Sequence, residues 1–205
     1  MTSNLPNSPI YGLVLSGGKS QRMGQDKGSL QYHGLSQREY LYKLLAGHCQ
    51  KVYVSIRPEQ ENSLETGLTF LPDSHTISGP FNGILSAMQK HPEAAWLVVA
   101  CDLPLIQKTT IQKLISERDQ QKLATAYALR ESDLPEPLLA IWEPKAYDAA
   151  VAFTSEGKNC PRKFLLNQDI KLIRPQRDEE LYNANAPEDL EFIKSRLQNG
   201  KIPTV

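Results

Sequence analysis

Residues 11–27 read YGLVLSGGKSQRMGQDK, an apolar run that passes directly into a stretch rich in glycine and basic side chains. Tyr11–Leu15 is short and largely apolar, which is typical of a buried strand. Gly17 and Gly18 permit backbone conformations and close approaches that a Cβ atom would forbid. Successive backbone N–H groups in such a turn form a concave site for an anion. The stretch therefore predicts a strand that ends in an anion-binding turn.

Three cations, Lys19, Arg22 and Lys27, follow the glycine pair, and Asp26 is the only acid among them. Basic side chains beside a glycine turn suit the charge of a triphosphate or a pyrophosphate. A flexible surface turn with a solvated cluster of charges explains the same residues. The spacing alone does not decide between these interpretations.

Two familiar phosphate-binding motifs do not fit this stretch. Residues 18–20 read GKS, as at the end of a Walker A motif, but the first glycine of that motif would fall at Leu13, inside the apolar run. The glycines at 17, 18 and 24 do not have the spacing of G-x-G-x-x-G either. We therefore reject a P-loop and a dinucleotide-binding fingerprint.

Strand and helix patterns alternate along the chain. Further apolar runs predict strands at Val52–Ile56, Trp96–Ala100 and Leu138–Trp142, and weaker ones predict strands at Leu68–Leu71, Ala124–Leu129 and Ile170–Ile173. Apolar side chains at helical spacing predict helices around residues 41–48, 81–88, 111–115 and 190–197, and the polar stretch Arg130–Pro137 predicts a surface turn. This alternation is typical of a single three-layer, Rossmann-like α/β domain. We expect a mostly parallel central sheet, helices on both faces, and a site at the carboxyl ends of the central strands.

Composition and charge exclude several classes of protein. Of 205 residues, 40% are hydrophobic and 22% charged, and 23 basic residues balance 23 acidic ones. These values exclude a disordered or collagen-like chain, and the missing basic excess argues against a nucleic-acid partner. No apolar run approaches the ~18 residues of a membrane helix, and MTSNLPNSP does not read as a signal peptide. Three widely spaced cysteines form neither a metal quartet nor a disulfide framework. We expect a cytoplasmic protein with one domain at 10–198, between loose tails at 1–9 and 199–205, and without a membrane partner.

Five motifs, in order along nearly the whole chain, resemble those of the nucleotidyltransferase family that includes molybdenum cofactor guanylyltransferase. Residues 15–27 resemble its L-A-G-G, R-M-G and D-K elements; Asp73 with Gly79-Pro80 resembles D…G-P-L-x-G; residues 101–104 resemble C-D-x-P; residues 136–140 resemble P-E-P-L-x-A; and residues 183–189 resemble N-x-N-T-P-E-D. Because all five motifs occur in the order found in the family, together they are far more specific than any one of them.

The resemblance implies a nucleotidyltransferase domain that transfers GMP from GTP to the phosphate of molybdopterin (molybdenum) cofactor, with Mg²⁺, and releases pyrophosphate. It implies that Leu15, Ser16, Gly17, Gly18, Lys27, Asp73 and Asp102 bind the nucleotide, that Arg22, Lys27 and Asp102 are catalytic, that Asp102 holds the metal, and that Gly79, Pro80, Asn183 and Asn185 bind substrate. Proteins that deliver and accept the cofactor are possible partners. A related transferase with another base or acceptor, such as a cytidylyltransferase or a sugar-phosphate nucleotidyltransferase, is the alternative function. A catalytically silent nucleotide-binding protein is a further alternative.

Each candidate side chain also has a structural interpretation. Asp102 follows a buried strand, where an aspartate can cap the next helix. Asp73 ends another predicted strand, where turn-forming aspartates are common. Asn183 and Asn185 precede Pro187, so either can form a turn or cap the last helix. Ser16 stands where the family motif has alanine, a change that we expect to be mild in size.

Overall fold

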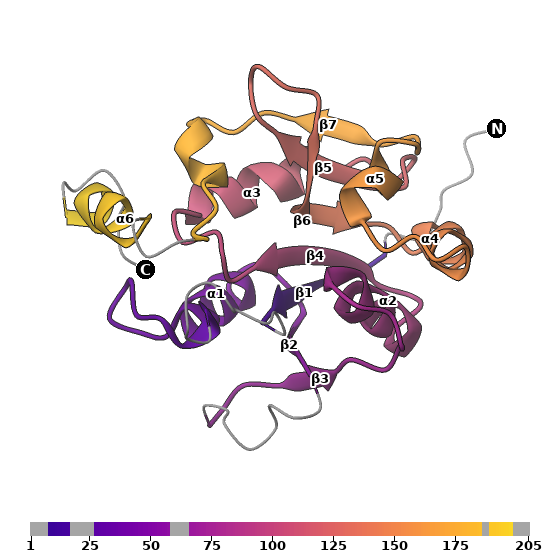
Figure 1. Cartoon of the computed structure of the whole chain (residues 1–205), viewed down its shortest axis with the longest axis horizontal. Helices are drawn as coiled ribbons and strands as arrows, with labels where there is room; N and C mark the ends of the chain where they lie inside the picture. Colours follow the sequence, from indigo (N-terminus) through magenta and orange to yellow (C-terminus); the bar gives the residue numbers. More distant parts are fainter. Residues whose placement is uncertain (1–7, 17–26, 58–65, 186–188, 199–205) are drawn as a thin grey trace.

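The computed structural model describes residues 8–16, 27–57, 66–185 and 189–198. Within these ranges the chain forms a seven-stranded sheet with the order β3-β2-β1-β4-β6-β5-β7, which Figure 1 shows in section. The strands are β1 (Ile10–Leu15), β2 (Lys51–Ile56), β3 (Phe70–Pro72), β4 (Ala95–Ala100), β5 (Ala124–Ala128), β6 (Pro135–Trp142) and β7 (Lys171–Ile173). The predicted α/β fold with a mostly parallel sheet is confirmed.

Every strand pair is parallel except the two that include β6. Strand β1 lies between β2 and β4, with Leu13 opposite Tyr53 on one side and Val98 on the other. Strand β6 runs antiparallel to both β4 and β5. Because β6 is reversed, its first residues lie at the same edge of the sheet as the last residues of β4 and β5.

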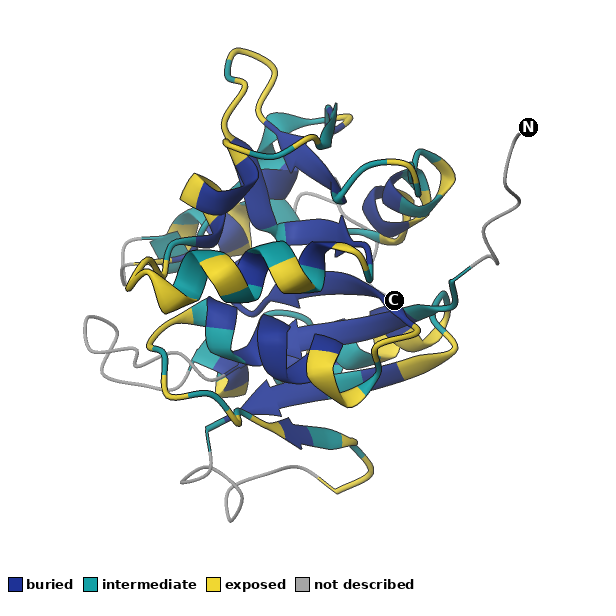
Figure 2. Cartoon of the chain, turned by 90° about the vertical axis from the view of Figure 1, so that its right-hand side faces the viewer, coloured by how far each residue is buried: buried dark blue, intermediate teal, exposed yellow. Residues whose placement is uncertain are grey.

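Helices cover both faces of the sheet (Figures 1 and 2). One face packs against α1 (Gln37–Ala46) and α3 (Lys108–Ser116), and the other against α2 (Pro80–Lys90), α4 (Ala146–Ser155) and α5 (Pro161–Leu165). Two short 3₁₀ helices, η1 (Lys27–Ser29) and η3 (Asp178–Leu181), and the last helix, α6 (Asp189–Gln198), complete the described structure. In the described residues, no helix is long and apolar enough to cross a membrane.

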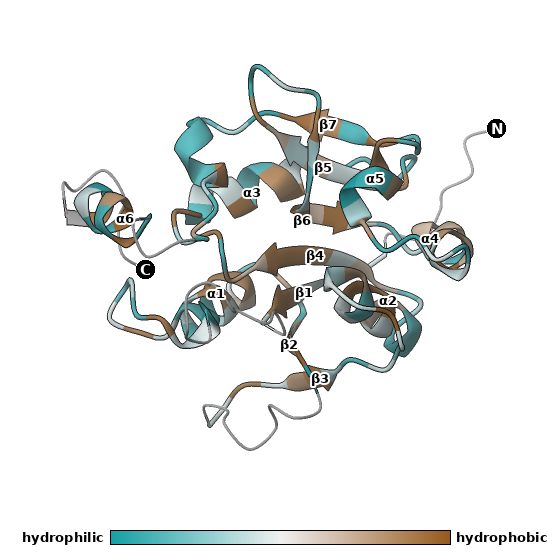
Figure 3. Cartoon of the chain, viewed as in Figure 1, coloured by the Kyte–Doolittle hydropathy of each residue, from teal (hydrophilic) through white to brown (hydrophobic). Residues whose placement is uncertain are grey.

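Most of the described core consists of one large apolar cluster on each face of the sheet, and a third, smaller cluster contains Leu105, Ala184 and Ile193. On the α2 side, Phe81 packs edge-on against Trp142 and Phe164, and all three are fully buried. On the α1 side, Leu41 and Leu45 pack with strand residues such as Val54. Figure 3 shows the hydrophobic residues of β1 and β4 between these layers. Burying each such side chain stabilises the fold by roughly 1.5–3 kcal/mol, which holds the carboxyl ends of the strands in fixed positions.

The strand order places a crevice at the carboxyl edge of the sheet. The chain leaves β1 toward β2 and β3 on one side, and it continues through β4 on the other side. In open α/β sheets, ligands bind where the order reverses in this way. The ends of β1, β2, β3 and β4 and the start of β6 meet at this edge.

Two details differ from the sequence-based expectation. The stretch Arg130–Pro137 is not all surface turn, because β6 begins at Pro135 and residues 135–137 are buried. Prolines are tolerated there because β4 joins β6 only from Leu139 onward, so this part of β6 pairs with β5 alone. Helices α4 and α5 were not predicted, while residue 48 lies beyond the end of α1.

Candidate functional site

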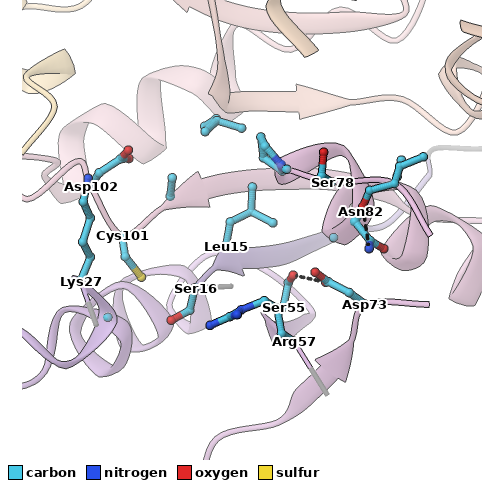
Figure 4. A pocket seen from close by; sticks show the side chains of 17 residues that line it. Leu15, Ser16, Lys27, Ser55, Arg57, Asp73, Ser78, Asn82, Cys101 and Asp102 are labelled. Atoms are coloured by element: carbon cyan, nitrogen blue, oxygen red, sulfur yellow. Dashed lines mark hydrogen bonds between the residues drawn. The ribbon is translucent and has the colours of Figure 1, made fainter. Parts of the chain in front are cut away.

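A cavity of about 560 Å³ opens at the carboxyl edge of the sheet. The sequence-predicted residues that line it are Leu15, Ser16, Lys27, Asp73, Gly79, Pro80 and Asp102. Among the described residues, the wall also includes Gly28, Ser55, Arg57, Ile77, Ser78, Asn82, Gly83, Ala100, Cys101 and Leu138. Figure 4 shows the cavity with these side chains. Gly17, Gly18 and Arg22 lie outside the described residues.

Asp102 follows β4 directly and brings a carboxylate to one end of the cavity. Its Oδ1 atom is buried and has no hydrogen-bond partner in the described part of the chain. Burial raises the pKa of Asp102 above its ordinary value, and the charge of Lys27 opposes this shift. Figure 4 shows the Lys27 side chain directed toward Asp102. A buried carboxylate oxygen of this kind is suited to bind a cation.

The capping interpretation of Asp102 is wrong for the helix that follows. Helix α3 begins at Lys108, and its N-cap is Gln107, whose backbone N–H bonds to Thr110 Oγ1 at 3.2 Å. Asp102 lies five positions before that cap. The Asp102 carboxylate therefore does not cap α3.

A segment near the C-terminus approaches the same end of the cavity. Lys27 Nζ donates a hydrogen bond of 2.8 Å to Asn185 Oδ1. The Ala184 N–H donates to the backbone oxygen of Asp102, also at 2.8 Å. The Asn183 side chain instead donates to Leu181 O at 3.3 Å, and Asn183 is not among the described residues that line the cavity. The structure thus brings Asn185, but not the Asn183 side chain, to Lys27.

Asp73 closes the other end of the cavity. Its Oδ1 atom accepts a hydrogen bond of 2.7 Å from Ser55 Oγ, at the end of β2 (Figure 4). Burial raises the pKa of Asp73, while the Ser55 hydrogen bond and the charges of Arg57 and His75 lower it. The guanidinium of Arg57 extends between Ser16 and Ser55. This end of the cavity therefore combines a carboxylate, a hydroxyl and a cation.

The loop between β3 and α2 forms the adjacent wall, and Asn82 holds it. Gly79 caps α2 with φ +89°, a conformation that favours glycine, and Pro80 is the first helical residue. Asn82 Nδ2 donates to His75 O at 2.6 Å and to Ile77 O at 3.1 Å, and its Oδ1 accepts from His75 N at 3.0 Å. The side chain thereby fixes the loop that carries Asp73 and Gly79.

Strand β1 contributes Leu15 and Ser16, both buried. The Ser16 N–H donates to Ser55 O at 3.1 Å, which continues the pairing of β1 with β2. The Ser16 hydroxyl accepts a hydrogen bond of 2.8 Å from Arg38 Nε, on the first turn of α1. The site thus rests on a buried arginine that does not itself line the described part of the cavity.

Strand β6 adds a second buried carboxylate near Asp102. Glu136 accepts a hydrogen bond of 2.8 Å from Arg162 Nη2 and another of 3.2 Å from Leu138 N. Burial raises the pKa of Glu136, Arg162 lowers it, and the negative charge of Asp102 raises it further. Leu138, two residues along the strand, reaches the cavity wall.

The polar residues that the sequence analysis missed include Ser55, Arg57 and Asn82, which line the cavity, and Arg38, which supports Ser16. A signal existed for Ser55 and Arg57, because both lie at the end of the predicted strand Val52–Ile56, at the edge where parallel strands meet. Asn82 and Arg38 lie in helices, and only the folded contacts reveal their role.

The fold and the cavity define an α/β protein of the nucleotidyltransferase class, with a nucleotide-sized cavity at the switch point of the sheet. Residues 12–172 match the MobA-like NTP transferase domain, and the chain belongs to this family.

Sequence relatives agree with this assignment. A molybdenum cofactor biosynthesis bifunctional protein of Synechocystis sp. is 39% identical over 91% of this chain and 54% of that protein. This chain thus spans about half the length of that relative. A probable molybdenum cofactor guanylyltransferase of Nostoc sp. is 27% identical, with 93% of both chains covered.

Solved structures share the fold. Molybdopterin-guanine dinucleotide biosynthesis protein A of Archaeoglobus fulgidus matches with a TM-score of 0.78 and 21% identity, over 92% of this chain and 99% of that one.

Proposed function

We propose that this chain transfers GMP from GTP to the terminal phosphate of molybdopterin (molybdenum) cofactor. The acceptor phosphate oxygen attacks the α-phosphorus, the bond from that phosphorus to the β-phosphate oxygen breaks, and pyrophosphate leaves. The product is the guanine dinucleotide form of the cofactor. The observation that carries the proposal is the pairing of Asp102 and Lys27 in the cavity of a MobA-like NTP transferase domain. The names of the sequence relatives support the choice of acceptor.

The residue types suit transfer of a nucleotidyl group. Charge accumulates on the departing pyrophosphate, and cations and backbone donors fixed in place stabilise it. Lys27 lies in the cavity for this task, and we propose the same role for Arg22 and for the backbone of Gly17 and Gly18. An acceptor phosphate monoester is already mostly ionised at neutral pH, because its second pKa is ~6. The reaction therefore needs no strong general base.

The residues present also fit Mg²⁺. Mg²⁺ prefers oxygen ligands and keeps several waters, so one buried carboxylate oxygen beside bound phosphates suffices. The Asp102 Oδ1 atom, buried and without a hydrogen-bond partner in the described residues, would supply that ligand. When bound, the metal would neutralise charge on the phosphates. Asp102 would hold it, and Lys27 would bind the nucleotide phosphates.

The remaining parts of the proposal concern the acceptor and the cell. We propose that Asn185, which accepts a hydrogen bond from Lys27, meets the acceptor phosphate. We also assign Gly79 and Pro80, which line the cavity, and Asn183 to substrate binding. The domain would span residues 10–198 and act in the cytoplasm. Proteins that deliver molybdopterin and receive the product would be its partners.

The decisive experiment measures pyrophosphate release with GTP, CTP, ATP and UTP, each with and without molybdenum cofactor. The proposal predicts that release is fastest with GTP and requires the cofactor. Release with a sugar phosphate as acceptor would support the alternative transferase. Nucleotide binding without release under any condition would support a silent binding protein.

Base choice has a physical basis. Guanine offers an acceptor at O6 and donors at N1 and N2, and we propose that backbone groups around residues 15–17 meet them, provided that the end of the strand runs alongside the base. A site that hydrogen-bonds its ligand rejects analogues that lack the partner, by more than an apolar pocket can. GTP should therefore be preferred over CTP and ATP, and equal turnover with CTP would remove the guanylyl assignment.

A further inference from the structure

We propose that Arg38 is a positioning residue for the site, because it holds together two segments that flank the cavity: the end of β1 with Ser16, and η1 with Lys27. This inference rests on the proposed function. Arg38 lies in the first turn of α1 and is 1% exposed. A buried guanidinium is costly unless it is bonded, so a fully buried arginine beside a ligand cavity needs a reason.

The first flanking segment is the end of β1. Arg38 Nε donates a hydrogen bond of 2.8 Å to Ser16 Oγ, and Ser16 is buried. Ser16 lines the cavity, and its N–H is fixed to Ser55 O. The arginine therefore sets the direction of the Ser16 side chain from behind the cavity wall.

The second flanking segment is η1, which carries Lys27. A Cβ atom added to Gly28 would overlap Ser16 Oγ and would come within 2.7 Å of Arg38 Nη2. The guanidinium and the Ser16 hydroxyl therefore both lie against Gly28. A larger residue at this position would have to displace the end of the arginine or of the serine side chain. Three residues, Ser16, Gly28 and Arg38, form one contact that fixes Lys27 relative to β1.

Arginine suits this position better than lysine. Its guanidinium can bond to Ser16 while another of its nitrogen atoms packs against Gly28, and it stays charged when buried. Helix α1 is itself anchored, since Tyr40 Oη donates to Ile106 O at 3.1 Å in the segment that follows Asp102. The buried positive charge also adds a favourable field for an anionic nucleotide, because screening is weak in the interior.

The test compares Arg38→Met with Arg38→Lys and with a matched control, Arg118→Met. Arg118 is also buried, and it bonds to Glu143 and to Ser8 O at the opposite edge of the sheet. We expect Arg38→Met to weaken GTP binding at least tenfold by calorimetry, and Arg38→Lys to weaken it less. Arg118→Met should lower the melting temperature without changing the dissociation constant of the folded protein.

A second pair of variants probes the contact with Gly28. Gly28→Ala alone should weaken GTP binding, because the new methyl group displaces the guanidinium and the serine. In the Arg38→Met background, Gly28→Ala should weaken GTP binding by a smaller factor, because the guanidinium that the new methyl group would displace is absent. Equal factors in both backgrounds would mean that Arg38 and Gly28 act independently, which contradicts the proposal.

A readout without nucleotide separates this inference from the proposed function. Hydrogen exchange of the Ser16 amide should be faster in Arg38→Met than in wild type, and unchanged in Arg118→Met. If wild type prefers another nucleotide or acceptor, the proposed function fails, while the exchange result still tests Arg38. Unchanged exchange at Ser16 in both Arg38 variants would overturn the positioning role.

Discussion

The buried carboxylate of Asp102 is expected to lower the stability of the folded chain, because it has lost contact with water. Its Oδ1 atom is buried without a hydrogen bond to any described residue, and burial raises the pKa of the carboxyl group. A carboxylate kept in such surroundings is common at functional sites, because a structural residue would be replaced by one that packs better. Substitution of Asp102 should therefore affect catalytic activity and folding stability in different directions.

We expect Asp102→Asn to abolish pyrophosphate release, with a loss of roughly 100-fold or more. The amide keeps the shape but lacks the charge that Mg²⁺ requires. The melting temperature should stay the same or rise at neutral pH, because a buried charge is removed. GTP should still bind in calorimetry, although more weakly. The control is Asp169→Asn, at an exposed residue paired with Lys122; lost turnover in that variant, or retained turnover in Asp102→Asn, would contradict metal binding by Asp102.

Asp73 predicts a dependence of stability on pH. Its pKa in the folded chain is raised by burial, so the folded state binds a proton more readily than the unfolded state. The stability linked to this proton is therefore full below the unfolded pKa and is lost as the pH rises through the folded pKa. The asparagine in Asp73→Asn cannot titrate, so this variant does not lose that stability as the pH rises. Its melting temperature relative to wild type should rise from pH 3 to pH 7, and a constant difference over that range would exclude the effect.

At the scale of single residues, local motifs predicted some site residues and missed others. Asp102 and Lys27 lie in short patterns next to predicted elements, so the sequence was sufficient to propose them. Ser16 was expected to be a mild change in size, yet its hydroxyl accepts a hydrogen bond from Arg38. That bond joins two elements across the fold, and no local pattern encodes it.

Among the elements, the start of α2 does more than bury apolar side chains. Asn82 makes two hydrogen bonds to His75 and one to Ile77, so the helix fixes the conformation of the preceding loop. Asp73 and Gly79, at the ends of this loop, both line the cavity. The helix thereby connects packing of the core with the shape of the site.

Asn82→Ala should lower the free energy of unfolding by about 1–3 kcal/mol, because buried backbone groups of the loop lose their partners. We expect KM for the nucleotide to rise severalfold while kcat changes little, since the side chain shapes the wall and lies away from Lys27 and Asp102 (Figure 4). The comparison variant is Asn167→Ala, whose exposed amide bonds only to Lys163 O among the contacts described. Denaturant unfolding and steady-state kinetics give both quantities, and an unchanged KM would show that the loop keeps its shape without Asn82.

The secondary structure was predictable where apolar residues gave a clear period. Strands β1, β2 and β4 agree with the prediction to within one residue at each end, because they are continuous buried runs. Helix α4 was missed because Ala146 and Ala150 form its fully buried side, and alanine gives a weak apolar stripe. Helix α5 has five residues, too few to show a helical period. The start of β6 was missed because two prolines masked a strand that pairs on one side only.

At the scale of the whole molecule, the site brings together an early segment and a late segment of the described chain. The hydrogen bond from Lys27 to Asn185 links η1 with the segment before α6. The Asn185 N–H in turn donates to Asp189 Oδ2 at 2.7 Å, at the start of that helix. The position of the last helix is thus coupled to the lysine of the cavity.

Asn185→Ala should reduce turnover more than GTP binding, because in the proposed function Asn185 meets the acceptor phosphate while Lys27 binds the nucleotide. Lys27→Ala should weaken GTP binding about ten- to hundredfold, the scale of one charge-assisted hydrogen bond. In the double variant the effect of Asn185→Ala on turnover should be smaller than in wild type, since the two residues act through one contact. Additive effects in this cycle would show that the contact has no role in the reaction.

The reversed strand β6 has a consequence for the order in which the chain folds. Strands β1 to β4 are contiguous in the sheet and come from the first half of the sequence, so they can assemble as soon as Ala100 is available. Strand β5 is made before β6 but lies beyond it, and it joins the sheet only through β6. During synthesis, strands β1 to β4 should therefore form their part of the sheet before β6 is available to pair with β5. Pulsed hydrogen exchange during refolding should show amides of β1 and β4 protected before those of β5 and β7.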